Sequence, residues 1–157
     1  MKTLIIEFDK QYREDFINLN KAWIEKYFDQ KEEHDQETFE NFENEILSNH
    51  GQVFFCLNEG KAIGTVAMFK YNDNCYELAK MAVKDEFQGY GISHLLIQAC
   101  LNYAKKSKAG KIILFTNSIL IQAINLYKKY GFIQVPVNQT KYKPSRVNIQ
   151  MELIVAS

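Results

Sequence analysis

Apolar residues follow two different spacings along the chain, and the two spacings alternate from segment to segment. Spacings of three and four residues are typical of amphipathic helices, whereas short alternating or continuous apolar runs are typical of strands. The first pattern predicts helices over residues 12–27, 39–50, 92–106 and 120–130. The second predicts strands over residues 3–8, 52–57, 61–71, 76–83, 111–116, 132–135 and 146–153. This order predicts an α+β or mixed α/β sheet with helices on both faces.

The chain contains no internal repeat, low-complexity segment or linker, so we expect a single domain over residues 1–157. Its apolar runs are too short to span a bilayer, and charges at Lys2 and Glu7 interrupt any signal-peptide core. The three cysteines are widely spaced and form neither a metal-binding pattern nor a disulfide framework. We therefore expect a cytoplasmic protein with no membrane partner and no metal.

Charge is balanced over the whole chain but not along it. The net charge is zero, which argues against general nucleic-acid binding. Residues 1–50 hold 13 acidic and 6 basic residues, whereas residues 51–157 hold 6 acidic and 13 basic residues. The first part would suit a cationic partner and the second a polyanionic one, unless both charge excesses are simply solvated surface.

A glycine-containing loop, Gln88-Gly89-Tyr90-Gly91-Ile92-Ser93, joins the predicted strand over residues 76–83 to the predicted helix over residues 92–106. Glycines let the backbone approach a ligand closely, and the first amides of a helix have no partner within it. The helix dipole adds partial positive charge at the same place. The loop therefore predicts a cradle for a phosphate or pyrophosphate; the alternative is a plain turn.

Three features, in order, carry a resemblance to a known family. Gln88-x-x-Gly91-x-Ser93 follows a strand ending in Met81-Ala82-Val83, Asn117 follows the next strand, and Leu126-Tyr127-Lys128-Lys129-Tyr130-Gly131-Phe132 closes the last helix. Together they resemble the GNAT superfamily of acyl-CoA-dependent N-acyltransferases. The chain departs from the family pattern at Ser93, where the family has glycine or alanine. It also has Leu120 where the family often has asparagine, so Asn117 could supply the polar contact instead.

The resemblance implies a GNAT-like domain with a mixed, mostly antiparallel sheet of about seven strands, flanked by helices. It also implies a splayed central strand pair that receives acetyl-CoA as co-substrate. The pantetheine arm would pair with the backbone of one strand, and the pyrophosphate would lie on the amides of the glycine loop. The cofactor-binding residues carried over in this way are Met81, Ala82, Val83, Gln88, Gly89, Tyr90, Gly91, Ile92, Ser93 and Asn117.

The resemblance also implies the catalytic pair. Glu77 occupies the position of the general base, and burial in its apolar strand would raise its pKa toward a useful range. Tyr127 occupies the position of the general acid for the thiolate leaving group. Without those roles, Glu77 would be an ordinary strand residue paired with a lysine and Tyr127 a core tyrosine. The amide of Met81 or Val83, near an expected β-bulge, is the candidate oxyanion donor.

The acceptor site would be built partly by the first helices, where Trp23 and Tyr27 precede the acidic residue Glu33. Aromatic rings beside carboxylates suit an organic cation, although the rings could equally be core and the acids solvated. We expect an N-acetyltransferase that moves an acetyl group from acetyl-CoA to a primary amine of a small molecule, amino acid or peptide. Transfer would be direct, in a ternary complex, and the family resemblance allows a homodimer. The alternative is a non-catalytic acyl-CoA-binding sensor or interaction module.

Overall fold

A single seven-stranded sheet organises the part of the chain that the computed structural model describes, which is residues 1–28, 39–137 and 146–155. The strands are β1 (Thr3–Glu7), β2 (Gln52–Asn58), β3 (Lys61–Asn72), β4 (Cys75–Val83), β5 (Lys111–Thr116), β6 (Ile133–Val135) and β7 (Ile149–Ile154). The helices are η1 (Lys10–Tyr12), α1 (Arg13–Tyr27), η2 (Glu43–Leu47), η3 (Asp85–Phe87), α3 (Ile92–Lys106) and α4 (Ile121–Lys129). The strand order is β1-β2-β3-β4-β5-β7-β6, and only the β4–β5 pair is parallel.

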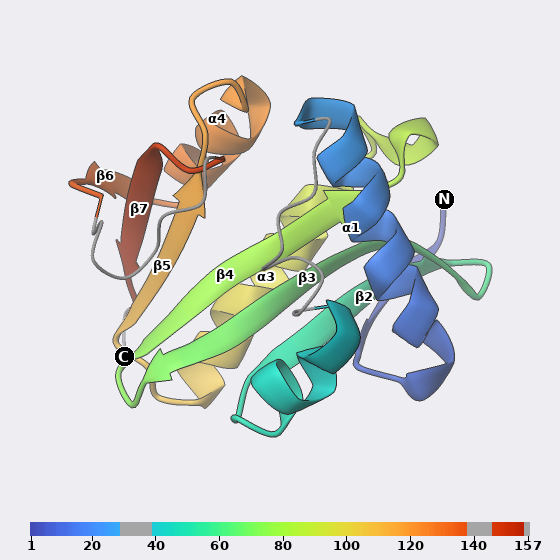
Figure 1. Cartoon of the computed structure of the whole chain (residues 1–157), viewed down its shortest axis with the longest axis horizontal. Coiled ribbons are helices and arrows are strands. Elements are labelled where there is room, and N and C mark those ends of the chain that lie inside the picture. Colours follow the sequence, from blue (N-terminus) through green and yellow to red (C-terminus); the bar gives the residue numbers. More distant parts are fainter. Residues whose placement is uncertain (29–38, 138–145, 156–157) are drawn as a thin grey trace.

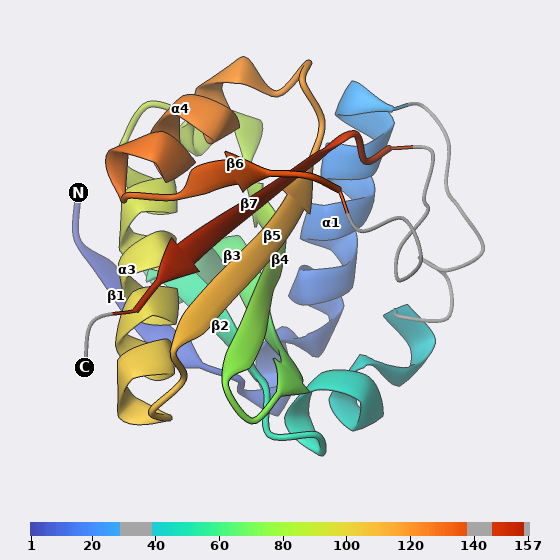
Figure 2. The same ribbon diagram turned by 90° about the vertical axis from the view of Figure 1, so that its left-hand side faces the viewer.

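Helices cover both faces of this sheet. In Figure 1 and in the perpendicular view of Figure 2, α1 and η2 lie on one face, while α3 and α4 lie on the other. The mixed, mostly antiparallel sheet flanked by helices confirms the predicted fold class. The seven predicted strands are all present, and their bounds shift by at most a few residues. Within the described residues, no helix is both long and apolar enough to cross a membrane.

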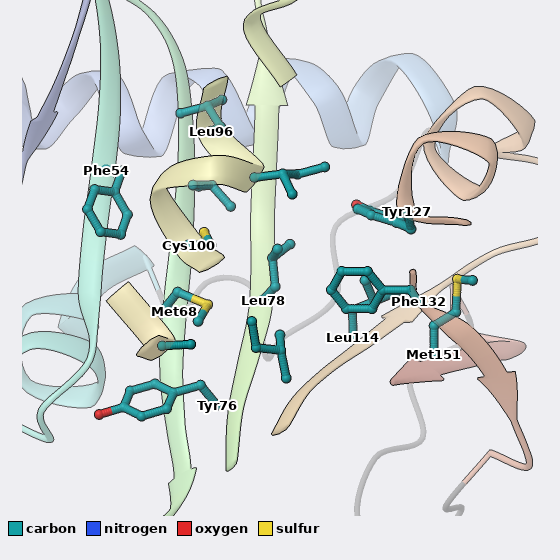
Figure 3. Close-up of a cluster of buried hydrophobic side chains, with 14 of the residues drawn as sticks. Phe54, Met68, Tyr76, Leu78, Leu96, Cys100, Leu114, Tyr127, Phe132 and Met151 are labelled. Carbon is teal, nitrogen blue, oxygen red and sulfur yellow. The ribbon is translucent and has the colours of Figure 1, made fainter. Parts of the chain in front are cut away.

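Each face of the sheet packs on its own hydrophobic cluster. Under α3 and α4, the cluster joins Leu96, Ile97 and Cys100 of α3 to strand residues such as Leu78 and Leu114, and Figure 3 shows part of it. Under α1 and η2, a second cluster gathers around Phe16, Phe42 and Phe55, which are fully buried. Burial of such side chains contributes roughly 1.5–3 kcal/mol each. The central strand β3 is buried along most of its length because both clusters use it.

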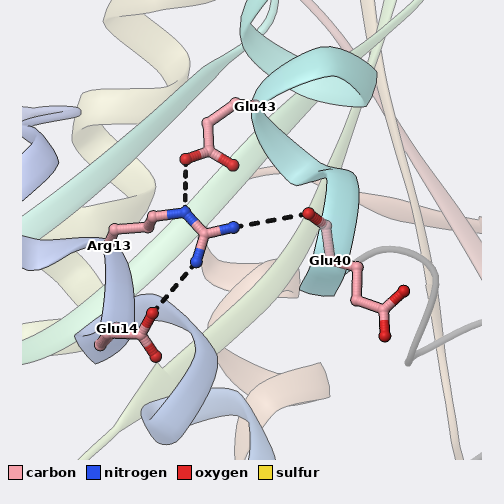
Figure 4. A network of polar contacts seen from close by, with 4 residues as sticks. All are labelled: Arg13, Glu14, Glu40 and Glu43. Carbon is pink, nitrogen blue, oxygen red and sulfur yellow. Dashed lines mark hydrogen bonds and ion pairs between the residues drawn. The ribbon is translucent and has the colours of Figure 1, made fainter.

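A polar network fixes α1 to the segment that contains η2. The guanidinium of Arg13, at the start of α1, donates to the carboxylates of Glu43 and Glu14 and to the backbone carbonyl of Glu40, as Figure 4 shows. The guanidinium carbon also lies 5.3 Å from the ring centroid of Phe42. Residues Glu43–Leu47 form one π-helical turn rather than α-helix. This turn keeps Ile46 in the core while Glu45 remains exposed.

The centre of the sheet opens between β4 and β5. Their parallel pairing consists of Cys75 with Lys111, Tyr76 with Ile112 and Glu77 with Ile113, and does not continue beyond. Further along, the pairing of β4 with β3 shifts by one residue between Ala79 and Ala82, and Lys80 adopts a positive φ of 58°. This is the expected β-bulge, which bends and twists the strand. The backbone of β4 beyond Glu77 is therefore exposed to the opening on its β5 side.

Candidate functional site

A long cleft of about 920 Å³ begins at this opening. The carboxyl end of β4 forms one wall with Met81, Ala82 and Val83, and α4 with the residues before it forms the opposite wall. The glycine loop and the first residues of α3 close one end, where Gln88, Gly89, Gly91, Ile92, Ser93 and His94 line the cleft. The structure thus brings together nearly all of the residues predicted from the loop and strand motifs.

The geometry of the loop suits an anion. Gly89 and Gly91 adopt positive φ angles of 85° and 78°, and a Cβ atom at either position would meet no atom within 4 Å. The amide of Leu95 donates to the carbonyl of Gly91. The amides of the first turn of α3 before it therefore have no helical carbonyl to bind. That first turn contains no acidic residue. A phosphate group would find amide donors, positive dipole charge and open space here, which is what the pyrophosphate of acetyl-CoA needs.

Hydrogen bonding holds the loop against β4. The side-chain amide of Gln88 donates to the carbonyl of Val83 at 3.1 Å, and the backbone amide of Lys84 donates to Ile63 of β3. The first bond ties the loop before α3 to the end of β4, and the second ties the residue after β4 to β3. The glycine loop is therefore positioned by the same strand that lines the cleft.

A second cavity of about 390 Å³ adjoins the cleft. Its lining includes Glu77, Leu78 and Lys80 of β4, Asn20 and Ile24 of α1, Phe115 and Thr116 of β5, and Tyr127 of α4. Because these residues come from both faces of the sheet, the cavity passes through the gap between β4 and β5. Trp23, Met81, Leu120 and Ala123 line both the cleft and the cavity. A ligand in the cleft could therefore meet a second ligand in the cavity.

The carboxyl of Glu77 has an unusually high pKa for a glutamate. Burial raises the pKa of its carboxyl from the ordinary 4.5 to about 7, and the positive charge of Lys80 opposes part of that rise. Glu77 lies on β4 at the last pair it forms with β5, facing the cavity between the separating strands. Near neutral pH such a carboxylate is available both with and without its proton, which suits a general base.

Tyr127 reaches the cavity from the other face of the sheet. Its ring packs 5.8 Å from the ring of Phe132, and Figure 3 shows the hydroxyl directed from α4 toward β4. Burial raises the pKa of this phenol, and the neighbouring Cys100 raises it further. The hydroxyl therefore keeps its proton at neutral pH, and can donate it only as a hydrogen bond or to a strong base.

Three predicted site residues lie away from the lining where a ligand contact was expected. Tyr90 is 63% exposed and packs against Phe87, outside both cavity walls. Asn117 also lies outside both walls: its side chain donates to the carbonyl of Arg146 and accepts from the amide of Ile119. Tyr27 lines the cleft and not the smaller cavity, while Trp23 lines both. Glu33 lies outside the described residues.

Several cavity residues were not among the predicted site residues. Lys80 and Arg146 bring positive charge to the smaller cavity, and Glu45 adds a second acidic group from η2. Lys80 had a sequence signal, because it interrupts an apolar strand three residues after Glu77. Arg146 had none, because only the pairing of β7 with β5 brings it to the cavity. Among the described residues, no three His, Cys, Asp or Glu side chains are grouped to hold a metal.

Comparison with known proteins agrees with this geometry. The model of the acetyltransferase (GNAT) family matches residues 16–132. An uncharacterized N-acetyltransferase of Schizosaccharomyces pombe is 29% identical over 60% of this chain and 64% of its own length. An N-acetylaspartate synthetase of Xenopus tropicalis is 30% identical over 71% of this chain, but the match spans only 42% of that relative.

The fold is also found among solved structures. A GNAT-family acetyltransferase from Staphylococcus aureus Mu50 superposes with a TM-score of 0.88 at 22% identity, covering 99% of this chain and 100% of that one. The family match extends from α1 to the start of β6 and so includes the glycine loop, Glu77 and Tyr127. By its sequence and its fold, this chain belongs to the acetyltransferase (GNAT) family.

Proposed function

We propose that this chain is an N-acetyltransferase that moves an acetyl group from acetyl-CoA to a primary amine of a small molecule, amino acid or peptide. The observation that carries the proposal is the pair of adjoining cavities, which share Trp23, Met81, Leu120 and Ala123. One contains an anion cradle and the other a carboxylate with a pKa near 7. Direct transfer in a ternary complex follows, because donor and acceptor would meet at the shared wall. The name of the Xenopus relative favours an amino-acid acceptor.

The residues of the cleft fit a CoA-type donor, which supplies the acyl thioester when bound. Met81, Ala82 and Val83 offer strand backbone that lacks a β5 partner, so an extended amide-containing arm can pair with it. The amides from Gly89 to Ser93 would hold the pyrophosphate. This arrangement would direct the reactive end of the donor toward Glu77 and Tyr127.

Glu77 and Tyr127 would have separate roles, because Glu77 would accept a proton and Tyr127 would donate a hydrogen bond. An amine must be neutral to attack, and Glu77, which lines the smaller cavity, would remove its proton. Tyr127, which stays protonated, would donate a hydrogen bond to the sulfur as the thiolate leaves. The bulge around Lys80 re-aims the β4 backbone, which makes the amide of Met81 or Val83 the proposed oxyanion donor.

The proposal also covers the domain organisation, the cellular compartment and the partners of the protein. Residues 1–157 would act as one N-acetyltransferase domain in the cytoplasm, with no metal and with neither nucleic acid nor membrane as partner. A homodimer is compatible with the proposal. The competing function is an acyl-CoA sensor, which tight CoA binding without transfer to any member of a broad amine panel would favour.

The cradle can be tested with two matched glycine variants. Gly91 and Gly60 have nearly the same φ, 78° and 77°, and neither would bring a Cβ atom within 4 Å of another atom. Alanine at either position should therefore lower stability by a similar amount, about 1 kcal/mol. We expect Gly91→Ala to weaken acetyl-CoA binding at least tenfold in isothermal titration, while Gly60→Ala binds like the wild type. Equal affinities in the two variants would mean that the loop is only a turn.

Removal of the proposed base gives the test of transfer. Glu77→Gln keeps the size of the side chain but cannot accept the proton, so we expect amine-dependent CoA release to fall about 100-fold or more. Acetyl-CoA binding should be unchanged, because the cradle is untouched. Glu59→Gln, an exposed change at the β2–β3 turn, is the matched control and should keep full activity. Undiminished turnover in Glu77→Gln would remove Glu77 from the mechanism.

The raised pKa of Glu77 also predicts a pH effect on stability. Folding raises this pKa from 4.5 to about 7, so the folded state holds the proton more tightly than the unfolded state. The stabilising contribution is present below pH 4.5 and is lost as the pH rises through 7. Between pH 5 and pH 8, urea unfolding should show the wild type losing about 2 kcal/mol more than Glu77→Gln. Parallel pH profiles for the two proteins would contradict the burial of this carboxyl.

A further inference from the structure

The lining of the smaller cavity contains a charged residue, Arg146, to which the proposed acetyl transfer assigns no role. Among the described residues, its lining carries two acidic side chains, Glu45 and Glu77, and two basic ones, Lys80 and Arg146. Proton removal from an amine needs only Glu77, and Lys80 is the group whose charge acts on that carboxyl. Arg146 stands apart from this pair, since it reaches the cavity from the segment that precedes β7.

The fold holds Arg146 at a defined place relative to Glu77. Its carbonyl accepts a hydrogen bond from the side chain of Asn117, and the amide of Asn148 donates to Thr116 at the end of β5. Glu77 pairs with Ile113, three residues earlier on β5. Three strand residues correspond to about 10 Å of rise. The side chains of Arg146 and Glu77 both line the same cavity of about 390 Å³, which has room for a small molecule.

The ring of Phe28 packs near the guanidinium of Arg146, and this contact affects which part of the guanidinium can bind a ligand. The guanidinium carbon of Arg146 lies 5.8 Å from the ring centroid of Phe28, and the ring of Phe28 packs 5.6 Å from that of Trp23. A ring covers the face of a guanidinium, while its N–H donors point outward from the edge. An edge of this kind matches a carboxylate with two parallel hydrogen bonds. Trp23 and Phe28 both line the cavity, so the contact lies on its wall.

We propose that Arg146 binds a carboxylate of the acetyl acceptor, so that the acceptor is an amine carrying a carboxylate a few bonds away. This inference rests on the proposed function and narrows it. A zwitterion would bring its amine to Glu77 and its carboxylate to Arg146, whereas an alkylamine without a carboxylate would make only the first contact. A free α-amino acid has this chemistry, and so does a peptide whose first residue is acidic.

The test compares acceptors that differ only at the carboxylate. Steady-state kcat/KM is measured by CoA release for α-amino acids, for the corresponding α-carboxamides, and for dipeptide amides that begin with Asp or Glu. We expect the wild type to prefer an acceptor with a carboxylate over its amide at least tenfold. Arg146→Gln should lose at least tenfold on the carboxylate acceptors, mainly through KM, and less than threefold on the amides. Preference for free amino acids or for acidic dipeptide amides identifies which carboxylate is bound.

Two controls separate this inference from general damage. Lys61→Gln removes an exposed positive charge that lines neither cavity and should change no acceptor. Acetyl-CoA affinity of Arg146→Gln should match that of the wild type, because the cradle is elsewhere. Amides used as well as acids by the wild type, or an equal loss of both in Arg146→Gln, would overturn the inference and leave the proposed function standing.

A binding measurement keeps the inference testable if no amine is acetylated. Isothermal titration of the CoA-saturated protein with the same acids and amides reports acceptor binding without turnover. Binding of the acids alone, abolished by Arg146→Gln, would support the carboxylate contact even if transfer were absent. No binding of any carboxylate-bearing amine to the CoA-saturated wild type would overturn it.

Discussion

Parallel pairing between β4 and β5 ends at Glu77 and Ile113, and the site depends on this early end. A continuous sheet would place hydrogen-bonded backbone where the cleft and the cavity now lie. The bulge at Lys80 turns the rest of β4 away, while β5 continues along β7 through Thr116. The opening is stable because both strands keep their outer partners and because the two hydrophobic clusters pack on either face of the sheet. The loss of a few central hydrogen bonds thus produces a passage through an otherwise packed sheet.

The opening between β4 and β5 also determines the electrostatic environment of Glu77. Glu77 lies where β4 leaves its partner, so its carboxyl is surrounded by protein while still facing a cavity. Burial then raises its pKa to about 7, and Lys80, held at the bulge, limits the rise. At the other end of the cleft, the first turn of α3 supplies amides that have no carbonyl partner within the helix. The buried carboxyl of Glu77 and the glycine loop are thereby held on one strand and the segment that follows it, with Gln88 bonded back to Val83.

The parts of the site that could be predicted from the sequence are those formed by residues close together in the chain. The glycine loop, the start of α3 and the β4 residues before it form one continuous segment, so their order in the sequence is their order along the cleft. The prediction for Glu77 followed from the family resemblance, because this residue of an apolar strand occupies the position of the family's general base. Tyr27 and Trp23 were assigned to one site, and their rings lie 5.4 Å apart on one face of α1, but only Trp23 reaches both cavities. Arg146 could not be predicted, because its position depends on the pairing of β7 with a strand more than thirty residues earlier.

The central claim is that the gap between β4 and β5 is the place where donor and acceptor meet. A crystal structure of the protein with bound CoA tests it most directly. The account predicts that the pantetheine amides pair with the backbone of Met81 to Val83 and that the pyrophosphate lies on the amides of Gly89 to Ser93. The sulfur would then lie within about 3–4 Å of the Tyr127 hydroxyl, at the wall shared with the cavity that contains Glu77. CoA bound elsewhere, or with its sulfur directed away from that cavity, would contradict the account.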